Sequence, residues 1–405
     1  MLTALLSSAQ QFEEAKLKAE DFIAKKVMLG GDLTLQYQAL DHSADGVKLI
    51  PLGDGFNLPT ANLNLTGLIA PGVKVHLTTY LSSRHHQESW VKDGYILFDA
   101  MTFLNVPVID NLMEDFRIKI GMMEMNYGDS HFRRSDNGST INNLFVGNYI
   151  LDAFTTSIGM EIYYQKDNFL GMFGISNGAL KPELVGYSNN EYSKYNLVDE
   201  MTYLLKFGYD KQFNDDFRLR ATVSAYFSPD HHKGSLYASE RAGSRYYMVM
   251  NEALDSSGDP IGSDAVNPTK NATSGRWGPG STSENNAYML NVFSKYKMFE
   301  LFATYEMTSG ETSKGIDFDM SQIAIEGIAR LGKKEQYYLG ARYNLVTNNE
   351  SGADDSIDRF QFVGGWDLTK NLKAKLEYVI QNYNDYARYP NGEFKGAMIE
   401  FAVSF

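Results

Sequence analysis

The stretch GAMIEFAVSF, residues 396–405, is more informative about the fold than any other part of this chain. Its residues alternate with the two-residue period of a β-strand, and one face carries Ile399, Phe401, Val403 and Phe405. A strand with one apolar face that ends on an aromatic residue fits the closing strand of a barrel, with the apolar face toward lipid. The alternative is the last strand of a soluble β protein. The rest of the chain favours the barrel.

The composition permits a membrane barrel and excludes a bundle of membrane helices. With 405 residues the chain is long for one soluble domain but ordinary for a large barrel, which needs no solid core. Mean hydropathy is −0.33, and no apolar run approaches the roughly 18 residues that a membrane helix needs. The 26 Tyr and 24 Phe residues can supply aromatic girdles at both membrane interfaces.

Charge, cysteine content and motifs narrow the classes of function. The formal net charge of −13 argues against nonspecific binding of nucleic acid, so no such partner is expected. The absence of cysteine excludes disulfides, thiolate metal sites and a cysteine nucleophile. The sequence contains no HExxH, P-loop, GxGxxG or nucleophile-elbow motif. We therefore expect no enzyme, and no catalytic residue, metal site or cofactor.

The first 27 residues differ in pattern from the rest. Residues 1–10 (MLTALLSSAQ) fit either the remnant of a signal region or a plain helical turn. Residues 11–27 carry an apolar stripe at spacings of three and four, made of Phe12, Ala15, Ala19 and Phe22. This pattern predicts a short N-terminal helix, which could be a periplasmic helix, a short coiled coil or a plug in the barrel mouth. The predicted organisation is an N-terminal segment, 1–27, followed by a barrel, 28–405.

From residue 28 onward the period is two, and about sixteen antiparallel strands are predicted. They cover 28–41, 59–70, 72–83, 89–102, 115–125, 152–165, 169–177, 199–210, 216–228, 286–297, 299–309, 320–331, 336–346, 358–368, 372–383 and 394–405. Short turns and long segments alternate along the chain, apart from a longer connection at 103–114 on the short-turn side. Short turns on one rim and long loops on the other match the periplasmic and extracellular sides of a transmembrane barrel.

Two features resemble a known family. About sixteen strands, a long third loop at 126–151 and a terminal phenylalanine resemble the bacterial outer-membrane porins. The stretch INNLFVGNYILDAFTTSIGMEIYYQ, residues 141–165, looks like the phosphate-selective porin family. The resemblance implies a location in the bacterial outer membrane, contact with its lipid, and a homotrimer. It also implies that the third loop folds inward and narrows the channel.

Basic residues fall on the lumenal alternates near the short-turn rim. The predicted basic collar consists of Lys74, Arg117, Lys119, Arg218, Arg220, Lys373 and Lys375. The same alternation places four carboxylates in the lumen, which reduce its positive charge: Glu300, Glu326, Glu377 and Glu400. The collar either raises the local concentration of anions or is part of a mixed lining whose basic residues extend toward the interface.

The third loop is predicted to place His131, Arg133 and Arg134 at the pore constriction. Arginine suits phosphate and carboxylate groups, but these two arginines could equally pair with Asp129 and Asp136 on a solvated loop. The sequence thus predicts a porin for passive diffusion of small solutes, with a preference for anions and, by resemblance, phosphate. The alternative is a nonconducting scaffold or partner-binding barrel, which requires a plugged lumen.

Overall fold

The computed structural model describes residues 10–57, 59–82, 89–134, 136, 138–178, 187–188, 191–192, 201–229, 234–238, 247–255, 257–262, 275–349 and 355–405. Its helices are η1 (Ala19–Asp21), η2 (Thr102–Leu104), α1 (Pro107–Asp115) and η3 (Ser130–Phe132). Its strands are β1 (Lys26–Ser43), β2 (Gly55–Phe56), β3 (Thr60–Ala70), β4 (Val73–Ser82), β5 (Ser89–Phe98), β6 (Phe116–Glu124), β7 (Thr156–Lys166), β8 (Phe169–Ser176), β9 (Tyr187–Ser188), β10 (Glu191–Tyr192), β11 (Thr202–Asn214), β12 (Phe217–Ser228), β13 (Thr282–Tyr296), β14 (Phe299–Thr312), β15 (Asp317–Leu331), β16 (Tyr337–Asn348), β17 (Ser356–Thr369), β18 (Leu372–Asn384) and β19 (Gly392–Ser404). Nearly all of the predicted signal remnant, 1–10, lies outside the described residues.

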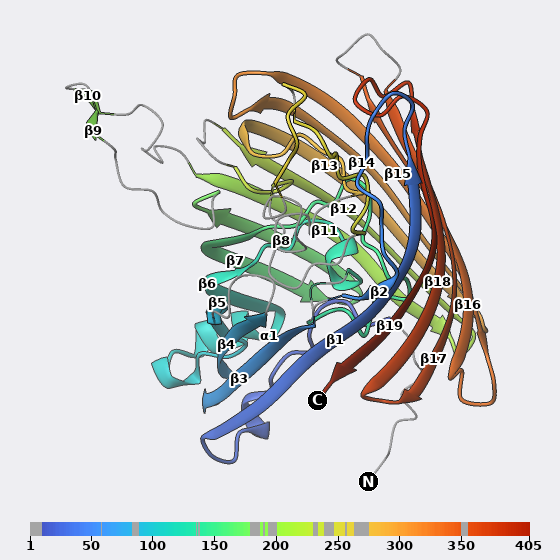
Figure 1. Cartoon of the computed structure of the whole chain (residues 1–405). Coiled ribbons are helices and arrows are strands. Elements are labelled where there is room, and N and C mark those ends of the chain that lie inside the picture. Colours follow the sequence, from blue (N-terminus) through green and yellow to red (C-terminus); the bar gives the residue numbers. More distant parts are fainter. Residues whose placement is uncertain are drawn as a thin grey trace.

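Sixteen long strands form a closed antiparallel ring (Figure 1). Each strand pairs with its neighbours along the chain, and β8 pairs with β11. β1 pairs with β3 on one side and with β19 on the other, which closes the barrel. All sixteen predicted strands are present, with ends within four residues of the predicted ends. The two-residue period therefore identified the wall of the molecule correctly.

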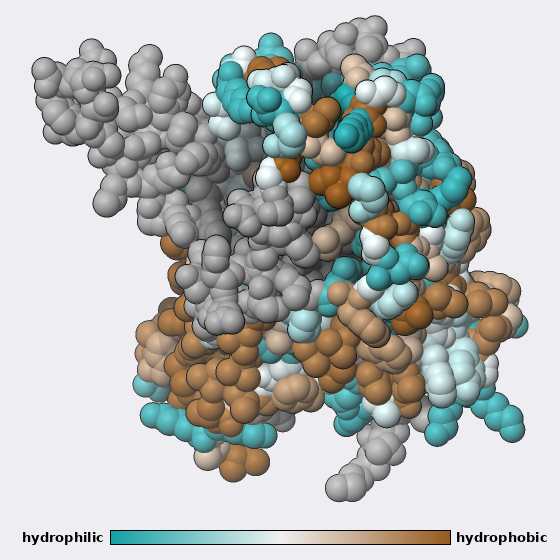
Figure 2. Space-filling view, in the orientation of Figure 1, coloured by the Kyte–Doolittle hydropathy of each residue, from teal (hydrophilic) through white to brown (hydrophobic). Residues whose placement is uncertain are grey.

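The wall has an apolar outer face and a polar inner face. On β19, Ile399 and Phe401 are 40% and 42% exposed, whereas Met398 and Glu400 between and beside them are fully buried. The same alternation runs along β14, β15 and β17. Figure 2 shows hydrophobic residues gathered over the lower part of the barrel, above a hydrophilic rim. An apolar outer band with a polar interior is the arrangement of a barrel that spans a bilayer.

The closure between β1 and β19 depends on the absence of a side chain at one glycine. Gly31 exchanges two backbone hydrogen bonds with Phe405, at 3.0 and 2.9 Å. A Cβ atom at Gly31 would lie 2.6 Å from the tip of the Phe405 ring. Glycine therefore allows the terminal aromatic ring to lie flat on β1, while Phe405 itself remains 69% exposed on the outer face. This contact covers the end of the closing strand.

Aromatic pairs lie beside the short turns. Phe213 and Phe217 stack at 5.3 Å across the turn between β11 and β12. Other pairs next to short turns are Phe116 with Tyr164, Phe169 with Tyr209, and Tyr337 with Trp366. Their amphipathic or apolar rings suit the boundary between hydrocarbon and headgroups. This aromatic girdle and the even-numbered closed barrel indicate the bacterial outer membrane, with the short turns on the periplasmic side.

The prediction of an N-terminal helix over 11–27 is wrong. This segment holds one 3-10 turn, η1, and β1 already begins at Lys26. Its polar backbone groups bond to the barrel instead of to each other: Arg117 donates to the carbonyl of Ala15 at 3.1 Å, and the amide of Leu17 donates to Asp99 at 2.8 Å. Tertiary hydrogen bonds thus override a narrow helical stripe.

The α-helix lies elsewhere. α1 occupies the longer connection between β5 and β6, and it begins with proline at its first position, where the missing amide hydrogen is not needed. Among the described residues, no helix is long and apolar enough to cross a membrane.

Candidate functional site: the filled lumen

The inner loop, defined here as the described residues between β6 and β7 (125–134, 136 and 138–155), lies inside the barrel. The amide of Val146 donates to Glu377 of β18 at 2.7 Å. The amide of Ile150 donates to Asn344 of β16, also at 2.7 Å. Most side chains of the loop are buried, and Ile150 has no exposed surface. The loop therefore folds inward, as the porin resemblance implies, and reaches the strands on the other side of the lumen.

Arg133, predicted at the constriction, joins the inner loop to the wall. Its Nη2 donates to Glu326 of β15 at 2.7 Å, and its guanidinium lies 4.5 Å from the centre of the Phe302 ring. Glu326 also accepts from Tyr149 at 2.7 Å and from Arg342 of β16 at 2.9 Å. One buried carboxylate thus connects two arginines and a tyrosine. This cluster holds the middle of the loop against β15 and β16.

Arg134 and His131, the other two predicted constriction residues, bond within the loop region. Arg134 Nε donates to Asp152 at 3.0 Å. The His131 ring lies 2.8 Å from a carboxylate oxygen of Glu124 and 2.9 Å from the side-chain oxygen of Asn126. All three predicted constriction residues are buried. The structure brings them into the lumen but gives each of them a polar partner.

The alternative pairing of Arg133 and Arg134 with Asp129 and Asp136 is wrong. Asp129 binds Lys206 and Arg220 of the wall, and Asp136 binds Lys92 of β5 at 3.2 Å. Asp129 and Asp136 therefore bind basic residues of the wall, whereas Arg133 binds Glu326 of the wall and Arg134 binds Asp152 of the loop.

The first collar cluster consists of Arg220 and Lys206 around the carboxylate of Asp129. This carboxylate lies 2.8 Å from Lys206 Nζ and 2.8 Å from Arg220 Nε. Burial by itself raises the pKa of Asp129, but the two cations and their hydrogen bonds outweigh it and hold the pKa well below the ordinary range. Arg218 lies beside this cluster and forms a two-pronged pair with Asp210, at 2.8 and 2.7 Å.

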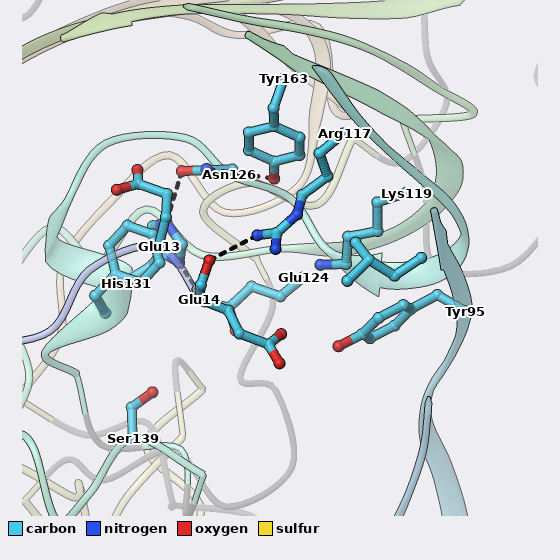
Figure 3. Close-up of a pocket in the computed structure, with 12 residues that line it drawn as sticks. Glu13, Glu14, Tyr95, Arg117, Lys119, Glu124, Asn126, His131, Ser139 and Tyr163 are labelled. Atoms are coloured by element: carbon cyan, nitrogen blue, oxygen red, sulfur yellow. Dashed lines mark hydrogen bonds and ion pairs between the residues drawn. The ribbon is translucent and has the colours of Figure 1, made fainter. Parts of the chain in front are cut away.

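The second collar cluster consists of Lys74, Arg117 and Lys119, of which Arg117 and Lys119 line a small cavity of about 160 Å³ (Figure 3). Arg117 makes a two-pronged pair with Asp99, at 2.6 and 2.9 Å. Lys74 pairs with Glu14. The ammonium of Lys119 lies 4.4 Å from the centre of the Tyr95 ring. Lysine over the face of a tyrosine is weakly stabilised by the ring, and Glu13, Glu14 and Glu124 line the same cavity without pairing with Lys119.

Lys373 and Lys375 form a third cluster on β18. Lys373 lies 3.4 Å from Asp367, and Lys375 lies 2.6 Å from Glu400. Lys375 also donates to the carbonyls of Thr140 and Phe145 in the inner loop, at 2.9 and 3.2 Å. This lysine thus fixes the loop to the closing strands.

The predicted collar residues therefore lie inside the wall in separate clusters, and most are paired. Six of the seven have a carboxylate partner within 4.0 Å. Within the described part of the chain, no carboxylate pairs with the seventh, Lys119. Of the predicted lumenal glutamates, Glu300, Glu326 and Glu400 form ion pairs, and Glu377 accepts from Tyr247 and from the amide of Val146. The positive charge read from the alternation is thus largely compensated.

Several important lumenal residues were missed in the sequence analysis. Arg342 donates to the carbonyl of Gly147 at 2.9 Å, and Arg359 donates to the carbonyl of Asn148 at 2.6 Å. Their positions on the inward alternates of β16 and β17 could have identified both. Glu13 and Glu14 were not identified, because the apolar stripe of residues 11–27 does not show which polar side chains of that segment would bind the wall.

Two small spaces lie beside the inner loop, and the described residues form no metal centre. Beside the 160 Å³ cavity, a space of about 10 Å³ remains among Arg133, Arg134 and Arg342. That space has room for about one water molecule. Within the described ranges, no three His, Asp or Glu side chains are arranged to hold a metal ion.

Comparisons with known proteins support the fold. No protein-family model and no curated protein matches the sequence. Solved structures with a similar fold include the anion-selective porin of Comamonas acidovorans, with a TM-score of 0.56, 10% identity, and coverage of 94% of this chain and 100% of that one. OprB of Pseudomonas putida has a TM-score of 0.54 and 10% identity, and the match covers 94% of each chain. The outer-membrane channel DcaP of Acinetobacter baumannii has a TM-score of 0.51 and 9% identity, and the match covers 97% of this chain and 100% of that one. Identities this low establish a shared barrel architecture alone.

Proposed function

We propose that this protein is an outer-membrane channel for passive diffusion of small solutes, with a path that the inner loop restricts strongly. The observation that carries the proposal is the inner loop itself, held inside a sixteen-stranded barrel by buried bonds to β15, β16 and β18. A loop that is held inside a wide barrel narrows the path through it, and so limits the size of the solutes that can pass. The fold it shares with solved porins and channels supports the same function.

We further propose a weak preference for anions that depends chiefly on Lys119. The other collar cations already have carboxylate partners, so their fields largely cancel at the distance of a passing ion. Lys119 lines the 160 Å³ cavity without such a partner among the described residues. A single uncompensated cation beside a narrow passage attracts an anion without binding it tightly, and conduction requires that balance.

Phosphate is the candidate solute that the family resemblance of residues 141–165 implies. Its support from the site is limited, because the two constriction arginines already bind Glu326 and Asp152. A homotrimer is proposed on the same resemblance. Light scattering with correction for detergent measures the number of chains, and a mass of one chain in the purified protein would contradict the trimer.

A nonconducting scaffold is the second candidate, and the filled lumen favours it. The side chains of Glu306, Arg359 and Phe394 on the inner wall have no exposed surface, which differs from the lining of a wide, water-filled channel. Such a barrel would act through its extracellular loops, of which 229–285 is the longest and lies partly outside the described residues.

Conductance in a planar lipid bilayer separates the two candidates. We expect small, discrete steps for the channel, whereas a scaffold gives none. Selectivity is then read from the reversal potential in a KCl gradient and in a potassium phosphate gradient. Lys119→Gln is expected to move the potential toward cation preference. Lys297→Gln, at an exposed position in a short turn, is the matched control and should leave it unchanged. Cation preference in the unmodified protein would contradict the anion proposal.

A further inference from the structure

Residues 10–18 enter the periplasmic end of the barrel and occupy part of its lumen. Phe12 is only 6% exposed. Its ring makes edge-on contacts with Phe132 of the inner loop at 5.9 Å and with Phe293 of β13 at 5.4 Å. The segment therefore has a specific docking position in an aromatic cluster that includes both the wall and the inner loop.

Glu13 binds the first collar cluster as a carboxylate ligand would. Its two oxygens accept from the two terminal nitrogens of Arg220, at 2.6 and 2.7 Å. The other edge of the same guanidinium is bound by Asp129. Lys206 lies 3.9 Å from Glu13. A two-pronged pair with both carboxylate oxygens is the geometry with which arginine recognises free carboxylates.

Glu14 binds the second cluster. Among the described residues, Glu14 is the carboxylate partner of Lys74. Both Glu13 and Glu14 line the 160 Å³ cavity with Arg117 and Lys119 (Figure 3). Two neighbouring carboxylates of the chain itself thus neutralise two separate sets of collar cations.

The segment is held in a way that permits exchange. It adds no strand to the sheet, and its backbone bonds go to side chains such as Arg218, which donates to the carbonyl of Gln10 at 2.8 Å. The Glu14 side chain is 52% exposed, and that of Glu13 is 11% exposed. Solvent therefore reaches Glu14 freely and Glu13 to a small extent while both carboxylates remain paired.

We propose that residues 10–18 are a displaceable internal plug, and that short dicarboxylates compete with Glu13 and Glu14 for Arg220 and Lys74. The segment covers cations that a dianionic solute could bind, so its departure both widens the periplasmic end of the lumen and leaves these cations available. The consequence for transport rests on the proposed channel function. The displacement itself does not depend on that function and is measured separately.

A single cysteine reports the position of the plug, because the chain has no cysteine of its own. Gln10 is 7% exposed, and Arg218 binds its backbone, so Gln10→Cys keeps that contact. In this background we compare the rate of reaction with a membrane-impermeant maleimide in three forms: no further change, Glu13→Gln with Glu14→Gln, and Glu20→Gln. Glu20 belongs to the same N-terminal region, but its side chain is 77% exposed and pairs with exposed Lys18.

The double variant should react about tenfold faster or more. Each charge-assisted contact that is lost lowers the ratio of docked to undocked segment by about that factor. The Glu20→Gln form should react at the original rate. Succinate should accelerate the reaction of the form with no further change, and should have a much smaller effect in the double variant. Equal rates in the double variant and the control, or no response to succinate, would overturn the proposal.

Bilayer conductance then tests the link to transport. The double variant should conduct more than the unmodified protein and with greater preference for chloride. Faster labelling with silence of every form in bilayers would support the plug and contradict the channel. Conductance without any change in labelling would support the channel and contradict the plug.

Discussion

The inner loop and the segment 10–18 both occupy the lumen of this barrel, and they are held in different ways. The inner loop is fixed by groups with almost no exposed surface, among them Glu326, Arg342 and Lys375. The segment 10–18 is held by the buried ring of Phe12, by hydrogen bonds from Arg117 and Arg218 to its carbonyls, and by two carboxylates, of which Glu14 is 52% exposed and Glu13 is 11% exposed. Removing one partner of a buried ion pair costs about 3–5 kcal/mol, whereas an exposed pair contributes about 0–1 kcal/mol. The loop therefore belongs to the fold, and the segment can be exchanged.

Of the changes considered, Glu326→Ala should loosen the inner loop most and so reduce the difference between the loop and the segment 10–18 most. It leaves the guanidinium groups of Arg133 and Arg342 buried without their shared carboxylate and removes the acceptor of Tyr149. We expect the loop to lose roughly 3–5 kcal/mol of anchorage. Limited proteolysis should then cut within 125–155, and single-channel conductance should rise.

The matched control is Glu284→Ala, which removes an exposed glutamate from β13. It should leave both proteolysis and conductance as they are in the unmodified protein. A loop that stays protected in Glu326→Ala would show that the backbone bonds to β16 and β18 suffice to hold it.

Phe12→Ala should have an intermediate effect, confined to the segment. It removes two aromatic contacts, each worth about 0.5–1.5 kcal/mol beyond the apolar area that they bury. We expect faster maleimide labelling at Gln10→Cys but no change in proteolysis of the inner loop. Increased cleavage of the loop in this variant would mean that segment and loop form one unit, against the contrast drawn above.

Breaking the pair between Arg134 and Asp152 should have the smallest effect on where the loop and the segment are held. Both partners belong to the inner loop, so their bond shapes the loop without tying it to the wall. A double-mutant cycle with Arg134→Ala and Asp152→Ala should give a coupling energy of about 0.5–3 kcal/mol in thermal unfolding. Conductance should change less than in Glu326→Ala. A larger change in conductance would indicate that Arg134 contributes directly to the constriction.

The strand wall could be predicted well because its physical rule is local. Apolar and polar residues must alternate along a strand that lies between lipid and a polar interior. The faces on which Phe401 and Glu400 lie can therefore be predicted from the neighbouring residues alone. The same rule placed Arg117, Arg220 and Lys375 on the inner side. Strand ends were less well predicted, as at β5, which ends four residues before its predicted end.

The contents of the lumen could not be predicted in the same way. The stripe of Phe12 and Phe22 has helical spacing, yet residues 10–18 run without a helix because Arg117 and Arg218 bind their carbonyls. Likewise, the sequence shows Arg133 next to Asp136 but not that Glu326, far along the chain, is its partner.

The sequence by itself therefore determined the sixteen strands, the face that each residue presents and the rim at which the short turns lie. These follow from alternation and turn chemistry, which act over a few residues. Only the tertiary structure decided how much charge in the lumen is compensated, because six of the seven collar cations pair with a carboxylate from another part of the chain, whereas Lys119 pairs with none among the described residues. Ion pairing depends on distance in space, and only closure of the barrel brings these distant residues together.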